Sequence, residues 1–92
     1  MAAHEAQRIR CFGVPYRQGW IEVWPGVHRG FVNLETWTVA GEFDLSAPDA
    51  SLASLPDSAI DGNTEVELSL DQARALVAAL QRAIGHLEDG RA

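Results

Sequence analysis

The chain has 92 residues and a mass of 10.0 kDa, which is enough for one domain. With 47% hydrophobic and 22% charged residues, its composition is that of a globular protein and excludes an intrinsically disordered chain. The only cysteine, Cys11, excludes an internal disulfide, and three scattered histidines beside one thiol exclude a Cys/His zinc cage.

The sequence carries no targeting or membrane signal. No run of apolar residues approaches the roughly 18 that a membrane-spanning helix requires. The first residues lack the basic-then-apolar layout of a signal peptide. We therefore expect a cytoplasmic protein with no membrane partner.

The first half of the chain has the pattern of β-strands. A short strand is predicted at about 8–12, and a second at about 20–25, where polar and apolar residues alternate. Pro25-Gly26 is typical of a type II turn. A tight hairpin therefore leads into a returning strand at about 27–39, which is rich in aromatic and β-branched residues.

The middle of the chain is predicted to be irregular. From about 46 to 63 it contains two prolines, small residues and few apolar anchors, so this loop is either mobile or used for contact. Asp61-Gly62-Asn63 indicates a turn that starts a strand at about 64–68.

The C-terminal third predicts an amphipathic helix over about 70–86. Ser69 and Gln72 have the spacing of a capping box at its start. Apolar residues recur at steps of three and four and form one stripe, which comprises Leu70, Ala73, Leu76, Val77, Leu80, Ile84 and Leu87.

These elements predict an α+β protein: a single domain with an antiparallel three- to four-stranded sheet and one C-terminal amphipathic helix packed on one face. A helix about 10 Å wide covers roughly two strands of one face, and no second helix is predicted for the other face. The aliphatic face is expected to meet the helix, so the mixed, Trp-rich face needs another cover.

Three interpretations of the Trp-rich face follow. Its aromatic residues are Trp20, Trp24, Phe31 and Trp37. They lie in the monomer core, covered by the 46–63 loop through Leu52 and Leu55, or form a homodimer interface, or line a groove for a small ligand or peptide. The homodimer is our leading hypothesis, with an unidentified protein partner also possible. A ligand-binding or enzymatic module would use His28 and Arg29 as polar contacts.

The charge distribution argues against direct nucleic-acid binding. The net charge is −6, and residues 30–73 contain nine acids and no Lys or Arg. Such a surface repels phosphates, which require clustered basic residues. An acidic inhibitor that mimics nucleic acid is therefore a third functional hypothesis.

No pattern of catalytic, cofactor-binding or metal-binding residues is present, so we name no catalytic residue, no cofactor and no metal. Cys11 lies in an apolar strand without a base nearby in sequence, which is typical of an inert buried thiol. Residues 61–65 resemble a fragment of a calcium loop but lack the rest of the twelve-residue motif, so a turn is preferred. We expect a binding protein and not an enzyme.

The segment 66–80, with the sequence VELSLDQARALVAAL, resembles the ending of many small uncharacterised actinobacterial proteins that are also found in actinobacterial phages. In those proteins a strand passes through Leu-Ser or Leu-Thr into a helix with an Ala-Arg-x-Leu-x-x-Ala-Leu core. The resemblance covers about 20 residues of the chain. It implies a strand followed by a helix and an actinobacterial or phage source, and it implies no activity.

Overall fold

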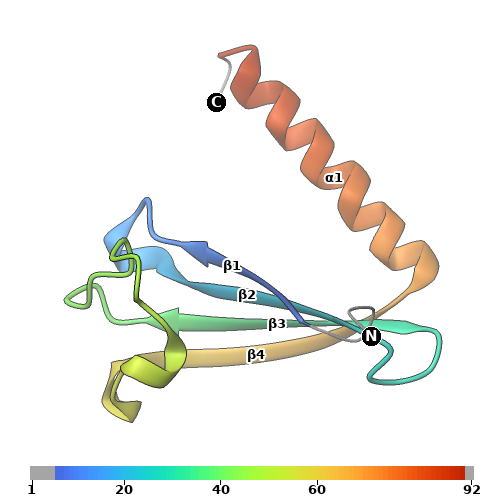
Figure 1. Cartoon of the computed structure of the whole chain (residues 1–92). Coiled ribbons are helices and arrows are strands. Elements are labelled where there is room, and N and C mark those ends of the chain that lie inside the picture. Colours follow the sequence, from blue (N-terminus) through green and yellow to red (C-terminus); the bar gives the residue numbers. More distant parts are fainter. Residues whose placement is uncertain (1–5, 91–92) are drawn as a thin grey trace.

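The computed structural model describes residues 6–90 and consists of a four-stranded antiparallel sheet followed by one helix (Figure 1). The strands pair in sequence order β1-β2-β3-β4. The predicted α+β fold class is therefore confirmed. The elements are β1 Gln7–Cys11, β2 Gln18–Pro25, β3 Phe31–Val39, β4 Ile60–Ser69 and α1 Leu70–Glu88, with short 3₁₀ turns at Pro15–Arg17, Leu52–Ser54 and Asp57–Ala59.

The hairpin between β2 and β3 is wider than the sequence indicated. The returning strand begins at Phe31, so the expected start at residue 27 and the two-residue Pro25-Gly26 turn are wrong. A loop over residues 26–30 connects the strands, with a hydrogen bond from the Gly26 N–H to the Phe31 carbonyl at 3.3 Å. Gly26 and Gly30 have φ of 74° and 84°, values that glycine adopts without strain, and they turn the chain at both ends of this loop.

The irregular connection also has different limits. It spans residues 40–59, and β4 begins at Ile60, so the predicted limits of 46–63 for the loop and 64–68 for the strand are wrong. Gly62 and Asn63 are not in a turn, because they pair with Thr38 and Trp37 of β3. A register shift between Thr38 and Val39 accommodates this stretch, so pairing with the neighbouring strand overrides the local turn preference.

The core lies between one half of the sheet and the 40–59 segment. Its buried residues are Trp20, Val39, Leu45 and Ala59. Leu52 and Leu55 pack against this cluster, as the first interpretation of the Trp-rich face expected. In Figure 1 the segment folds at the end of the sheet where β3 stops and β4 starts. The chain therefore covers part of its own aromatic face.

Two side chains attach the 40–59 segment to the sheet. The Gln18 side-chain amide, which is buried, donates to the carbonyls of Ala40 at 2.9 Å and Phe43 at 2.8 Å. The Arg10 guanidinium donates to two carbonyls further along, at 3.1 and 2.6 Å. Because these bonds satisfy backbone carbonyls that have no strand partner, they hold the segment against the sheet although it has little regular structure.

The helix α1 begins as predicted and continues two residues further, to Glu88. The capping box is confirmed, because the Gln72 backbone N–H donates to the Ser69 hydroxyl at 3.2 Å and the Ser69 N–H donates to the Gln72 side chain at 2.9 Å. The helix contacts β4 and β3 and then rises away from the sheet (Figure 1). None of its residues is buried.

Candidate interaction surfaces

The sheet has one charged face and one uncharged face. Residues paired across neighbouring strands share a face, so the register assigns every strand residue except Asp61, which lies at the register shift. The charged face contains Arg8, Arg10, Gln18, Trp20, Glu22, Trp24, Phe31, Asn33, Glu35, Trp37, Val39, Ile60, Asn63, Glu65, Glu67 and Ser69. The uncharged face contains Gln7, Ile9, Cys11, Gly19, Ile21, Val23, Pro25, Val32, Leu34, Thr36, Thr38, Gly62, Thr64, Val66 and Leu68.

A buried carboxylate lies at the centre of the charged face. Glu22 is only 4% exposed, between the two tryptophans of its strand. Its Oε1 accepts a hydrogen bond from the Trp37 indole N–H at 3.0 Å, and its Oε2 forms an ion pair with Arg8. These two partners compensate for the removal of the charge from water.

The remaining acids of the charged face also have partners in the chain. The Asn33 amide donates to Glu65 at 2.7 Å, and the Asn63 amide donates to Glu35 at 3.0 Å. Among residues 6–90, no buried side-chain nitrogen or oxygen lacks a hydrogen-bond partner. The polar groups of this face therefore stabilise the sheet itself.

The structure separates the aromatic and polar residues that the sequence grouped together. Trp20 lies in the core, paired with the half-buried Trp37, while Trp24 is half-buried further along and Phe31 is 44% exposed at the hairpin. The exposed His28 interacts with Glu67, near Trp24 and away from the Trp20–Trp37 pair. Arg29 is exposed in the 26–30 loop. The interface and ligand-contact roles of these residues stay predictions.

The uncharged face is the aliphatic face that the sequence predicted the helix would cover, yet much of it is exposed. On the two outer strands, Ile9 and Val66 are 54% and 53% exposed. On the central strands, Ile21, Val23 and Leu34 are half-buried. None of the strand residues that the register places on this face is Asp, Glu, Lys or Arg, and Asp61 of β4 lies at the register shift without a strand partner. The alternation of side chains in 20–24 and 31–39 predicted this apolar face. No local pattern indicated that the helix would cover so little of it.

The apolar stripe of α1 is a second exposed apolar surface. Its large side chains are between 36% and 66% exposed, and they are Leu70, Leu76, Val77, Leu80, Ile84 and Leu87. Asp71, Arg74 and Arg82 lie outside this stripe because of the 100° step between residues, whereas Glu88 in the last turn has the same angular position as Leu70. One chain thus exposes two apolar surfaces.

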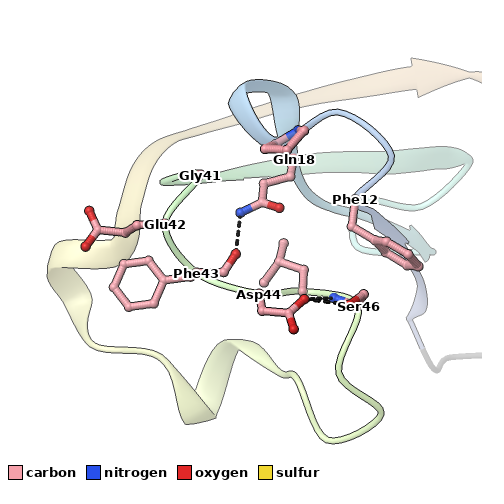
Figure 2. Close-up of a pocket in the computed structure, with 9 residues that line it drawn as sticks. Phe12, Gln18, Gly41, Glu42, Phe43, Asp44 and Ser46 are labelled. Atoms are coloured by element: carbon pink, nitrogen blue, oxygen red, sulfur yellow. Dashed lines mark hydrogen bonds between the residues drawn. The ribbon is translucent and has the colours of Figure 1, made fainter.

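The hollows of the surface are lined by groups that already have partners. One hollow of about 240 Å³ lies beside the 40–46 stretch (Figure 2), where the Gln18 amide donates to the Phe43 carbonyl. In the same place the hydroxyl and the backbone N–H of Ser46 donate to Asp44, at 2.5 and 2.9 Å. These hydrogen bonds lower the pKa of Asp44 below its ordinary value. The arrangement is typical of a loop anchor.

A larger hollow of about 490 Å³ lies between β1 and the 48–53 stretch and is lined in part by Arg8, Arg10 and Trp20. Both guanidiniums are engaged, one with Glu22 and the other with the carbonyls of Leu45 and Ala47. Through these contacts both arginines stabilise the fold.

Comparisons with known proteins give no relative: no protein-family model, curated protein or solved structure matches the chain. Within residues 6–90, no helix has both the length and the apolar character needed to cross a membrane. In that same part of the chain, no group of three or more His, Cys, Asp or Glu side chains is placed to hold a metal ion. The exposed apolar surfaces are the features on which a functional conclusion can be based.

Proposed function

We propose that this protein is a protein–protein interaction module that acts through homodimerisation in the cytoplasm. The observation that carries the proposal is the exposure, on one small chain, of both the uncharged sheet face and the apolar stripe of α1. Water-exposed surfaces of monomers rarely contain contiguous apolar patches of this kind.

The chain is more extended and exposes more surface than a compact monomer of its size, which supports the presence of a partner. Its radius of gyration is 14.9 Å, whereas a compact domain of this length has one of about 12 Å. Its accessible surface is 6888 Å², whereas a compact monomer of 10.0 kDa exposes about 5,200 Å². The excess is larger than the ~800 Å² that each partner contributes to a standard interface.

The exposed helix gives a second reason. A helix of 19 residues with little tertiary packing is only marginally stable in water, because helices in proteins are held mainly by the burial of an amphipathic face. Burying the half-exposed side chains of the stripe contributes about 1 kcal/mol each. Counted for both copies, this is of the same order as the ~4–15 kcal/mol that association costs.

The charge distribution favours a protein partner over nucleic acid. Glu88 is the one charged residue along the stripe of α1, the paired residues of the uncharged face include none, and the charged face contains more acids than bases. Phosphate binding would require an excess of basic residues over acidic ones.

Sedimentation equilibrium of the purified chain tests the proposal. We expect a species of about 20 kDa, twice the 10.0 kDa of one copy, at micromolar concentration. Because the proposed interface is apolar, about 1 M NaCl is not expected to dissociate it. A monomer at roughly 100 µM would refute homodimerisation, since specific dimers of standard interface size are tighter than this.

A further inference from the structure

We infer that the two copies exchange their helices, so that α1 of each lies on the uncharged sheet face of the other. This inference rests on the proposed homodimer and adds which surfaces meet. The occupant of the uncharged face is thus the apolar stripe of a second copy.

The junction between β4 and α1 directs the helix away from its own sheet after its contacts with β4 and β3 (Figure 1). No residue separates the two elements, because Ser69 ends β4 and is also the N-cap of α1. The two hydrogen bonds of the capping box, between Ser69 and Gln72, fix the first turn relative to the strand. For α1 to close onto its own uncharged face, this junction would have to rearrange.

The dimensions of the two apolar surfaces agree. A helix of 19 residues is about 28 Å long. The strands β2, β3 and β4 have eight, nine and ten residues, which corresponds to about 26–33 Å. A helix of this length therefore runs along the whole face, and its width of about 10 Å covers two of the four strands.

The distribution of charge selects the uncharged face over the charged one. Against the uncharged face, the stripe meets aliphatic and threonine side chains and buries no charge. Against the charged face, it would remove water from Glu35 and Glu65, whose partners are neutral amides. A dimer that joins only the two helices would leave the whole uncharged face exposed on both copies. The exchanged arrangement buries the stripe and, in the same contact, two strands of the uncharged face.

Two variants of the full chain separate the surfaces. The helix variant Leu80→Glu/Ile84→Glu places two charges in the stripe, and the sheet variant Ile9→Glu/Val66→Glu places two charges on the uncharged face. All four positions are more than half exposed, so the fold of the single copy tolerates the changes. We expect each variant alone to be monomeric, with a dissociation constant at least about a hundredfold above that of the unmodified chain.

The control for the helix variant is Ala75→Glu/Ala79→Glu. It adds the same two charges at the same spacing in the same helix, on the side opposite to the stripe. It is expected to dimerise like the unmodified chain. For the sheet, Ile9→Thr/Val66→Thr keeps β-branched residues in the strands, and it is expected to weaken the dimer in the same direction but by less. Circular dichroism confirms that each variant is folded.

Mixing the two monomeric variants gives the decisive result. In a helix-exchanged heterodimer, the intact helix of the sheet variant meets the intact sheet face of the helix variant. One of the two contacts is therefore undamaged, and native mass spectrometry should show a heterodimer that neither variant forms with itself.

Three outcomes overturn parts of the reasoning in distinguishable ways. If the unmodified chain dimerises but the mixture gives no heterodimer, helix exchange is wrong and self-association stands. If the sheet variant or the Thr variant dimerises as well as the unmodified chain, the sheet face is not in the interface and helix exchange is again wrong. If the unmodified chain is monomeric, both the proposed function and this inference fail.

Discussion

The buried carboxylate of Glu22 allows a quantitative test of what holds the charged face together. It accepts the Trp37 indole N–H at 3.0 Å and pairs with Arg8. A hydrogen bond to a charged acceptor contributes about 1.5–3 kcal/mol, and a buried donor left without a partner costs a similar amount. The side chain of Arg8 is 60% exposed, so its ion pair contributes at most about 1 kcal/mol.

These magnitudes predict an order among three variants. Glu22→Ala should lower the free energy of unfolding by about 2–4 kcal/mol, because it leaves the indole N–H without an acceptor. Glu22→Gln keeps an acceptor oxygen for the indole and should cost about 1 kcal/mol. Arg8→Ala should cost about 0–1 kcal/mol, because the guanidinium is largely solvated already.

Urea denaturation monitored by tryptophan fluorescence measures the three differences. All measurements are made at one protein concentration, since the stability of a dimer depends on concentration. For a chain of this length, 1 kcal/mol corresponds to about 4–8 °C in Tm, so Glu22→Ala should also be visible in thermal melts. If Arg8→Ala is as destabilising as Glu22→Ala, the exposed ion pair and not the buried indole bond holds this face, and our reasoning is refuted.

Three further predictions concern the loops and the helix. Gly19→Ala should destabilise the fold by about 3 kcal/mol or more, because the added Cβ would lie 1.7 Å from the Trp37 carbonyl oxygen. In contrast, the added Cβ of Gly85→Ala meets no atom within 4 Å, so this variant should raise Tm through a gain of about 0.5–1 kcal/mol in helix propensity. Similar thermal melts for the two variants would contradict this prediction. Gln18→Ala removes two of the four side-chain hydrogen bonds that Gln18 and Arg10 donate to the 40–59 segment, so limited proteolysis should cut this segment faster while the strands stay protected. Unchanged cleavage would show that the Gln18 anchor is dispensable. Because the pKa of Asp44 is lowered, its carboxylate contributes stability above its ordinary pKa of 3.8, and this contribution is lost as the pH falls through the pKa of the folded state. Asp44→Asn should therefore flatten the acid limb of a plot of stability against pH. An unchanged acid limb would be evidence against the hydrogen bonds from Ser46.

The sequence predicted those elements whose signal is local. The stripe from Leu70 to Leu87 and the Ser69–Gln72 pair define the helix and its first residue, and the structure has both. Alternation placed Trp20, Glu22 and Trp24 on one face, as the register confirms. These features depend on residues close in sequence, so a single chain without relatives is sufficient to predict them.

The features that were missed depend on contacts between distant residues. Gly62 and Asn63 have a strong turn signal, but pairing with Thr38 and Trp37 places them in β4. The anchoring of the 40–59 segment by Gln18 joins positions 22 and 25 residues apart, which no local pattern indicates. The direction of α1 relative to the sheet is likewise a property of the β4 junction in three dimensions. For the candidate surfaces, the sequence identified which faces are apolar and could not show which one the chain covers itself.

The outer edge of the sheet at β4 is protected from aggregation by its charge. β4 is an edge strand of ten residues, and such a row of unpaired backbone groups is a template for the addition of further strands. Asp61, Glu65 and Glu67 give this rim a repulsive negative charge at neutral pH. Neutral substitutions such as Glu65→Gln/Glu67→Gln remove that repulsion, so they should promote the growth of fibrils from this edge.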